Sequence, residues 1–443
     1  LYLTNFGGDA LYLNRGGGRF ARVEAGGLDN RRWATSAAFF DFDRDGRLDL
    51  YVCNYCDYKP PVQCKLNNGR VDYCAPVGFA GTIHRLYRNE TRPGAKDPSE
   101  IRFRDVTVAA GIAAKPGRGL GALPVDFDDD GWPDLYVAND AERNFAWRNL
   151  RNGGFEDAAA ELNVAVDGVG RSQASMGLAE GDVDGDGRPD IVATSFRSEY
   201  TILYRAGKHA FEDASARYGL PASTRRYTGF GVALEDFDGD GNLDLVQANG
   251  MVTQPDAAAG ALPPADPLKD PAGVAAFWRL YAEPMVFLKG DGRTFRESLT
   301  AAGELAKLHA VARGLAVGDL DGDARPDLVV VPSATPARLF HCAGNQAGRR
   351  LSLRLVDPNL GGRDALGAKV VACVGEYRRI ATLRTASSYQ SASEPTIRLG
   401  LGKRDGPVRI EVRWPSGDPT PEVFENVPAD RPATLRRGEG RIK

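Results

Sequence analysis

The chain has 443 residues, of which 42% are hydrophobic and 26% are charged, and its formal net charge is −3. This near-neutral balance argues against nucleic acid or a membrane surface as the partner, and no apolar run approaches the ~18 residues of a membrane-spanning helix. The length is enough for a large core and a second domain. Arginine outnumbers lysine beside abundant alanine, which hints at a GC-rich bacterial gene.

The chain opens on a strand-like segment. Residues 1–5 repeat the pattern of residues 135–139, and residues 11–20 supply the turn and outer strand of the same unit. An Asp-rich loop precedes residue 135, but none precedes residue 1. We therefore expect the chain to begin inside a repeat. The repeat would be completed by a further N-terminal segment with a signal peptide, or by strands of a neighbouring subunit.

Five copies of the pattern Asp-x-Asp-x-Asp-x-x-x-Asp begin at residues 41, 126, 182, 236 and 319. Each copy places carboxylates at loop positions 1, 3, 5 and 9, so hard oxygen ligands converge around one turn and predict about five Ca²⁺ sites. The predicted side-chain ligands are Asp41, Asp43, Asp45, Asp49, Asp126, Asp128, Asp130, Asp134, Asp182, Asp184, Asp186, Asp190, Asp236, Asp238, Asp240, Asp244, Asp319, Asp321, Asp323 and Asp327. The residues expected to bind through the backbone carbonyl at position 7 are Arg47, Trp132, Arg188, Asn242 and Arg325.

These loops are not EF-hands, because position 12 lacks the bidentate Glu of that motif. The residues found there are Val52, Val137, Ala193, Gln247 and Val330. A short apolar strand follows each loop, and a strand of small residues precedes it. A bound ion would therefore tie the two strands of a hairpin together at their turn.

The loop motif recurs with a unit of about 55 residues and two longer insertions. Each unit also contains an outer pair of strands, such as residues 203–205 and 211–213. Four short strands per repeated unit predict a β-propeller over residues 1–344, with an incomplete first blade. A helical solenoid is disfavoured because no long stretch has a 3.6-residue apolar period.

Four of the six cysteines lie in one insertion, and an even number of cysteines beside calcium loops indicates a secreted or cell-surface location. The disulfides that we expect are Cys64 with Cys74, Cys53 with Cys56, and Cys342 with Cys373. A four-cysteine zinc site is the alternative, although only Cys53 and Cys56 have ligand spacing. Covalent haem is disfavoured because Asp57, not His, follows Cys56.

The same insertion, residues 53–79, carries aromatic side chains with polar tips. They are Tyr55, Tyr58, Tyr73 and Phe79. This composition is common at interfaces, so the insertion is expected either to offer a contact surface or to pack over its blade.

The sequence changes character at about residue 345, where the Asp-rich loops stop. Residues 345–443 contain alternating β segments at residues 351–356, 368–374, 397–401, 408–414, 423–427 and 433–436. They predict a small, β-sandwich-like all-β domain.

The Asp loops resemble VCBS/FG-GAP propeller repeats. Residues 366–370, 387–391, 399–402 and 412–417 resemble motifs of the ASPIC/UnbV domain. The whole chain is thus similar to the bacterial relatives of cartilage acidic protein. This resemblance implies an all-β fold with a seven-bladed, integrin-α-like propeller, calcium in the blade loops, and an extracellular role in adhesion or assembly. The cysteine hairpin ending at residues 72–76 also fits.

Two features depart from that resemblance. Cys53 and Cys56 are additions, and Ala324 replaces the glycine at position 6 of the last loop. Because alanine in the left-handed region costs roughly 1 kcal/mol, we expect this loop either to bind its ion most weakly or to avoid a positive φ at Ala324.

No catalytic constellation is evident in the sequence. The four histidines, His84, His209, His309 and His341, are scattered over different units, which favours surface or turn roles over general-base catalysis. Asn54, Asn139 and Asn249 follow the loops at a constant spacing; they either line one face and bind a ligand or satisfy turn backbone.

The sequence therefore predicts a non-catalytic, calcium-stabilised interaction, adhesion or assembly module. Its partner would be a protein or glycan at the cell surface, or further copies of the chain in an oligomer or filament. The alternative is a polysaccharide-active enzyme or a glycan-binding protein that uses one propeller face.

Overall fold

The computed structural model describes residues 1–24, 26–59, 64–65, 69, 71–72, 74–253, 276–333, 335–343 and 348–442. The regular secondary structure of this part is mostly β-strand, with short α-helices at α1 (Leu220–Thr224) and α3 (Leu299–Ala302). No helix within it is long and apolar enough to cross a membrane. Tyr73, one of the predicted interface aromatics, lies outside the described residues.

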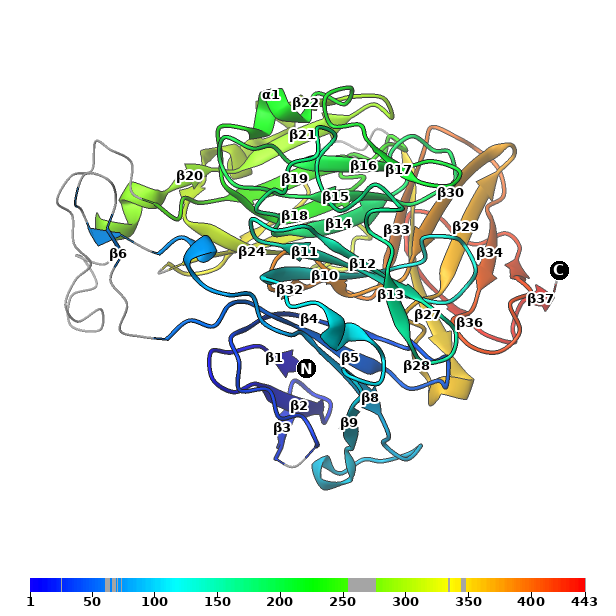
Figure 1. Cartoon of the computed structure of the whole chain (residues 1–443). Helices are drawn as coiled ribbons and strands as arrows, with labels where there is room; N and C mark the ends of the chain where they lie inside the picture. The colour runs from blue at the N-terminus through cyan, green and yellow to red at the C-terminus, as the bar shows by residue number, and fades with distance from the viewer. Residues whose placement is uncertain are drawn as a thin grey trace.

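The described residues before residue 344 form a series of small antiparallel sheets that stack beside one another (Figure 1). The four-stranded sheets are β4 (Ala34–Phe40), β5 (Asp49–Asn54), β8 (Arg85–Asn89) and β9 (Phe103–Asp105); β10 (Gly119–Val125), β11 (Asp134–Asn139), β12 (Phe145–Asn149) and β13 (Phe155–Asp157); β14 (Leu178–Gly181), β15 (Asp190–Ala193), β16 (Ile202–Ala206) and β17 (Phe211–Asp213); and β18 (Gly229–Glu235), β19 (Asp244–Asn249), β21 (Val286–Gly290) and β22 (Phe295–Glu297). The three-stranded sheets are β1 (Tyr2–Leu3), β2 (Ala10–Asn14) and β3 (Phe20–Val23), and β24 (Ala312–Gly318), β25 (Asp327–Pro332) and β26 (Arg338–Phe340). The two-stranded pairs are β6 (Cys64–Lys65) with β7 (Val71–Asp72) and β20 (Glu283–Pro284) with β23 (His309–Ala310).

Alternate side chains of one strand pack against different neighbouring sheets. In β5, Leu50 and Val52 pack toward the sheet of β1–β3, whereas Tyr51 and Cys53 pack toward the sheet of β10–β13. The period of two residues in a strand gives each sheet two buried faces. The sheet that contains β5 therefore packs between two neighbouring sheets, as a blade does in a propeller.

Small residues in the first strands allow close packing at the centre. The inner strands β4, β10, β14, β18 and β24 contact one another in sequence around the ring. A Cβ at Gly121 of β10 would lie 2.5 Å from the carbonyl oxygen of Met176, and one at Gly177 would lie 2.0 Å from that of Phe230. The glycine-rich strands before the Asp loops are thus required by the approach of backbone to backbone.

The C-terminal residues form a separate two-sheet unit with one shared core. One sheet contains β28 (Arg363–Asp364), β27 (Arg349–Asp357), β33 (Ile397–Gly402) and β36 (Pro432–Arg436), and the other contains β30 (Tyr377–Thr382), β29 (Lys369–Val374), β34 (Arg409–Arg413), β35 (Glu422–Phe424) and β37 (Arg441–Ile442). Leu353 of β27, Val370 of β29 and Leu399 of β33 belong to the same buried cluster. Side chains from both inner faces fill this core, which is the packing of a β-sandwich.

The all-β, propeller-like class expected from the sequence is confirmed. Seven blades and a closed ring stay predictions. The domain limit between residues 344 and 345 also stays a prediction, because residues 344–347 lie outside the described part.

Candidate metal loops and the domain that covers them

The first aspartate of each loop organises the turn through backbone amides. In the first loop, the amides of Asp45 and Gly46 donate to the two carboxylate oxygens of Asp41 at 3.0 and 2.9 Å. The amide at position 6 makes the same bond in the other four loops. The spacing in the sequence thus folds the loop around its position-1 carboxylate, as in an Asx turn.

The last aspartate joins three segments of its sheet. Asp49 begins β5, is fully buried, and accepts hydrogen bonds from the amides of Phe42 at 3.1 Å and Asn89 at 2.7 Å. Asp134, Asp190, Asp244 and Asp327 repeat this pair of bonds. Position 9 therefore fixes the distance between the loop and the third strand, whatever else it binds.

Position 6 requires a left-handed backbone in every loop. The four glycines there have φ between 82° and 96°, and Ala324 has φ 68°. Of the two expected alternatives, the weakest ion binding in this loop stays a prediction. Avoidance of a positive φ at Ala324 is wrong, because its amide is held 2.9 Å from Asp319 in the bond that every other loop makes. That bond offsets the roughly 1 kcal/mol cost of the left-handed alanine.

The structure brings three carboxylates close together in each of the first four loops. In the second, third and fourth loops, donor atoms from positions 1, 3 and 9 all lie within 4.8 Å of one another, and in the first loop those from positions 1, 3 and 5 do. The groups are Asp41, Asp43 and Asp45; Asp126, Asp128 and Asp134; Asp182, Asp184 and Asp190; and Asp236, Asp238 and Asp244. Such all-oxygen groups are the donor type that hard divalent cations prefer.

Burial and mutual repulsion disfavour the ionised form of the carboxyls at positions 1 and 9 of the first four loops. Burial raises the pKa of the position-1 carboxyls of the first four loops to about 6, and neighbouring carboxylates raise it as well. Burial raises the pKa of the position-9 carboxyls of the same loops to about 8. Within the described part of the chain, the buried Oδ1 of Asp182 has no hydrogen-bond partner. A cation bound among these oxygens would compensate both the burial and the repulsion.

The position-7 residues make a different contact. The amides of Arg47, Trp132, Arg188, Asn242 and Arg325 each donate to the position-5 carboxylate of the same loop, at 2.7 to 2.9 Å. Their role as carbonyl ligands stays a prediction.

The C-terminal domain sits on the loop end of the propeller. Arg363 donates to the carbonyl of Gly46 at 3.1 Å, and Tyr377 and Arg379 both donate to the carbonyl of Gly241 at 3.1 Å. Lys369 and Arg413 bind Asp129 of the second loop at 2.7 and 3.1 Å, and Glu394 accepts from the amide of Asp319 at 2.9 Å. Side chains of this domain thus contact both backbone groups and a carboxylate of the acidic loops.

A hairpin of the same domain packs against the inner strands of the propeller-like sheets. β31 (Ala386–Ser387) contacts β4, β10 and β14, and β32 (Ser391–Ala392) contacts β24. Ser388 pairs with Leu178 in both directions, and its hydroxyl accepts from the amide of Val232 of β18 at 3.0 Å. Tyr389 packs edge-to-face on Phe230 with ring centroids 4.9 Å apart. All five inner strands therefore contact this short segment, which the sequence analysis had identified only as a family motif.

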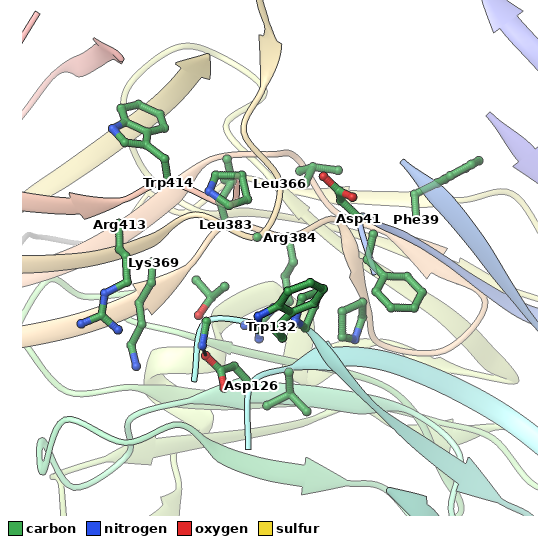
Figure 2. Close-up of a pocket in the computed structure, with 18 residues that line it drawn as sticks. Phe39, Asp41, Asp126, Trp132, Leu366, Lys369, Leu383, Arg384, Arg413 and Trp414 are labelled. Atoms are coloured by element: carbon green, nitrogen blue, oxygen red, sulfur yellow. Dashed lines mark hydrogen bonds between the residues drawn. The ribbon is translucent and has the colours of Figure 1, made fainter. Parts of the chain in front are cut away.

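A small cavity of about 80 Å³ lies where the two domains meet (Figure 2). Trp132 of the second loop supplies an aromatic wall, and Asp41 and Asp126 stand at the edge of the cavity. Two basic side chains that line the cavity already form ion pairs: Arg384 with Glu180 and Lys369 with Asp129. The cavity is therefore part of the joint between the domains.

The opposite end of the propeller is lined by the residues that precede β4 and follow β5. The ring centroid of Trp33 lies 5.5 Å from that of Phe6, 5.1 Å from that of Tyr55 and 5.8 Å from that of Tyr58. The ring centroids of Tyr58 and Phe79 are 5.3 Å apart. We call Phe6, Trp33, Tyr55, Tyr58 and Phe79 the aromatic cluster. Phe6 is 58% exposed. In Figure 1, the β6–β7 hairpin that extends from this region projects away from the C-terminal domain.

The recurring asparagines form hydrogen bonds with backbone carbonyls and do not line a ligand-binding face. Asn54, Asn139 and Asn249 are fully buried, and their amides donate to the carbonyls of Ile83, Arg143 and Pro284 at 2.7 to 2.8 Å. This is the second of the two roles that the sequence left open.

The histidines occupy four different places in the fold. His84 is buried, its Nδ1 lies 2.7 Å from the Tyr51 hydroxyl, and burial lowers its pKa to about 4. His209 and His309 are exposed. His341 lies beside Asp321 of the fifth loop. Sequence reasoning missed this last position, although an alignment of the third strands of the repeats would have revealed it.

One of the three predicted disulfides is formed in the described residues, Cys64–Cys74. The other predicted pairs are wrong, because Cys53, Cys56, Cys342 and Cys373 are free. Cys53 lies in the core between two sheets, where its thiol donates to the carbonyl of Gly121 at 3.5 Å, and the thiol of Cys342 donates to that of Phe237 at 3.1 Å. The bond between Cys64 and Cys74 also removes the four-cysteine zinc alternative.

Two family descriptions match the chain. The FG-GAP-like repeat matches residues 1–52, 126–193 and 182–246, and ASPIC and UnbV matches residues 359–442. The first four Asp loops fall within the matched residues and the fifth does not.

Curated relatives agree with this assignment. Cartilage acidic protein 1 of Homo sapiens is 28% identical over 395 residues, which cover 86% of this chain and 50% of that protein. Cartilage acidic protein 1 of Xenopus tropicalis is 27% identical over 406 residues, with 88% and 53% covered. The chain thus spans about half the length of the curated relatives it matches.

Solved structures give a weaker likeness. An Agrocybe aegerita lectin that recognises non-reducing terminal N-acetylglucosamine is 16% identical with a TM-score of 0.39, and 77% of this chain and 76% of that chain are covered. Rhamnogalacturonan lyase YesW is 15% identical with a TM-score of 0.31, with 76% and 66% covered. Scores this low carry no argument about function. The family descriptions and the curated relatives identify the chain as a member of the group that joins FG-GAP-like repeats to a C-terminal ASPIC and UnbV domain, homologous to cartilage acidic protein 1.

Proposed function

We propose that the protein is an extracellular, calcium-stabilised interaction module that binds its partner with the end of the propeller opposite the C-terminal domain. The observation that carries the proposal is the position of that domain. It contacts the first, second, fourth and fifth acidic loops and places the β31–β32 hairpin against the inner strands, so the aromatic cluster is left at the free end. A closed ring of seven blades belongs to the same proposal.

Calcium would be held by the carboxylates of the loops. The all-oxygen donor groups and the raised pKa of the position-1 and position-9 carboxyls support a hard divalent cation there. The bound ion would stabilise the turns that the C-terminal domain contacts. Binding at about 100 times Kd stabilises each site by ~2.7 kcal/mol, so several sites rival the whole stability of an ordinary fold.

An extracellular location is supported by the Cys64–Cys74 disulfide and by the homology to cartilage acidic protein 1. The partner would be a protein or glycan. Edge-to-face rings around Trp33 supply the apolar area with polar tips that both partner classes use. A polysaccharide-active enzyme at this end is the alternative function.

The test is quantitative binding to immobilised extracellular matrix proteins and to a glycan array, with calcium and with chelator. The variant Phe6→Ser with Tyr58→Ala removes exposed aromatic area, and Val108→Ser, at a position 80% exposed elsewhere, is the matched control. We expect the double variant to weaken binding at least about tenfold, or 1.4 kcal/mol, with the control unchanged. Unchanged binding in the double variant would exclude this end as the binding face. Turnover of a bound polysaccharide would favour the enzyme.

A further inference from the structure

The fifth loop differs from the other four in the third strand of its sheet. In each sheet, one residue at the end of that strand or just after it donates its amide to Oδ1 of the position-9 aspartate; these donors are Asn89, Asn149, Ala206, Gly290 and Cys342, at 2.7 to 2.9 Å. The residue just before the donor is Arg88, Arg148, Arg205, Lys289 or His341. The first four are permanent cations, and the fifth is a histidine.

The permanent cations are engaged with carboxylates. Arg88 pairs with Asp43 at 2.6 Å, Arg205 pairs with Asp184, and Lys289 pairs with Asp238, in each case with Oδ2 at loop position 3. A guanidinium or ammonium group has only N–H donors and therefore cannot coordinate a metal. An imidazole at the same place offers a nitrogen lone pair.

The imidazole of His341 lies near two carboxylates of the fifth loop, at distances longer than those of hydrogen bonds. Its Nδ1 lies 3.7 Å from Oδ2 of Asp321 and 3.5 Å from Oδ1 of Asp327. Both separations exceed the 2.7–3.2 Å range of N–H···O bonds. Two ligand atoms that each lie about 2.1 Å from one ion are separated by about 3.4 Å in tetrahedral geometry.

From these observations we propose that the fifth loop is a site for a divalent transition metal such as Zn²⁺ or Co²⁺, with Asp321, Asp327 and His341 as ligands. In the second to fourth loops the clustered donors come from positions 1, 3 and 9; here His341 takes the place of position 1. Imidazole nitrogen with carboxylate oxygen selects Zn, Ni or Cu over Ca. The proposal rests on the loops of the proposed function but assigns this one loop a different ion.

The neighbouring groups are consistent with such a site. Both oxygens of Asp327 accept backbone amides, from Leu320 and Cys342 at 2.9 Å, and such partners orient a ligating carboxylate. His341 is 57% exposed, so an ion can enter and water can complete its coordination. The thiol of Cys342 points to the carbonyl of Phe237 and is not a ligand.

The experiment is a Co²⁺ titration of the full chain saturated with Ca²⁺, followed by visible absorption and by the hyperfine-shifted imidazole N–H resonance. We expect one tight site in the wild type. His341→Arg, which restores the cation of the other loops, should weaken Co²⁺ binding beyond the 10–100-fold that loss of an outer hydrogen-bond partner causes. His309→Ala, at another exposed histidine, should change nothing. Lys289→His in the fourth loop should create a second Co²⁺ site.

Three results would overturn the proposal. They are no saturable Co²⁺ site in a protein that binds Ca²⁺ normally, equal Co²⁺ affinity in His341→Arg, and loss of the site in His309→Ala. Ca²⁺ titration of the same samples is scored separately, so failure of the calcium loops and failure of this site are distinguishable. An unchanged melting temperature of His341→Arg shows that the fold is intact.

Discussion

Tyr389→Ala is expected to uncouple the C-terminal domain from the propeller. Tyr389 is 8% exposed at the tip of the β31–β32 hairpin and is buried with Leu120, Met176 and Phe230 of the inner strands. Truncating a buried aromatic residue to alanine costs about 3–5 kcal/mol. Because its partners belong to the propeller, this loss weakens the contact between the domains. With a urea slope of about 2 kcal/mol/M, it corresponds to a shift of ~2 M in midpoint for the C-terminal domain.

Two tryptophans allow the two domains to be followed separately. Trp147 is buried in the propeller, and Trp414 is buried in the C-terminal domain, where its indole donates to Glu422 at 2.8 Å. In 5-fluorotryptophan protein, ¹⁹F NMR during urea unfolding should show both signals disappearing together in the wild type. In Tyr389→Ala, the Trp414 signal should disappear at lower urea. Leu435→Ala, in the core of the C-terminal domain itself, is the control for destabilisation without loss of the hairpin contact.

The reasoning is refuted if the two signals of Tyr389→Ala still disappear together at the wild-type midpoint. Tyr389→Phe should stay within about 1.5 kcal/mol of the wild type, because it retains the ring that packs on Phe230. A loss in Tyr389→Phe as large as in Tyr389→Ala would assign the effect to the hydroxyl and not to packing.

Three further predictions concern the loops and the core. Asp190→Ala should lower the free energy of unfolding by about 2–6 kcal/mol with or without calcium, because two buried amides lose their acceptor. Asp184→Ala should destabilise the protein only when calcium is present. Thermal melts of both variants with calcium and with chelator distinguish the two effects. His84 has a pKa of about 4 in the fold, below its unfolded value of 6.5. The free energy of unfolding should therefore fall by up to ~3 kcal/mol as pH decreases from 6.5 toward 4. Urea midpoints measured at both pH values should show this decrease in the wild type and not in His84→Gln. Under denaturing, non-reducing conditions four thiols should react with a labelling reagent while Cys64 and Cys74 do not, and six reactive thiols would contradict the disulfide.

Local periodicity predicted most of the strands. Residues 351–356 were expected as a strand and lie within β27, and residues 368–374 nearly coincide with β29. Both predictions depend only on alternation within a few residues, which is the pattern of a strand beside a core. The loop spacing similarly predicted where β5 begins, because Asp49 has both a loop and a strand role.

Contacts between distant segments could not be predicted from the sequence. The β31–β32 hairpin is short and polar, so its burial at the centre of the ring depends on space that five separate sheets create. The incorrect disulfide between Cys53 and Cys56 has the same origin. The short spacing between the two cysteines suggested a disulfide bond. However, the alternation of side chains along β5 directs the thiol of Cys53 into the core between two sheets. The place of His341 likewise appears only once the third strands are aligned by their hydrogen bonds.

The register of one hairpin explains why the two ends of the propeller have different roles. Phe40 pairs with Asp49 at the loop end of β4 and β5, and Ala34 pairs with Asn54 at the other end. A seven-residue strand separates these ends by about 20 Å. The carboxylates that begin each second strand therefore collect at one end. At this end Arg363 and Arg379 of the C-terminal domain donate to loop carbonyls, and Lys369 pairs with Asp129. Residues just outside the same strands collect at the opposite end, so a partner that binds there need not compete with the domain for the loops.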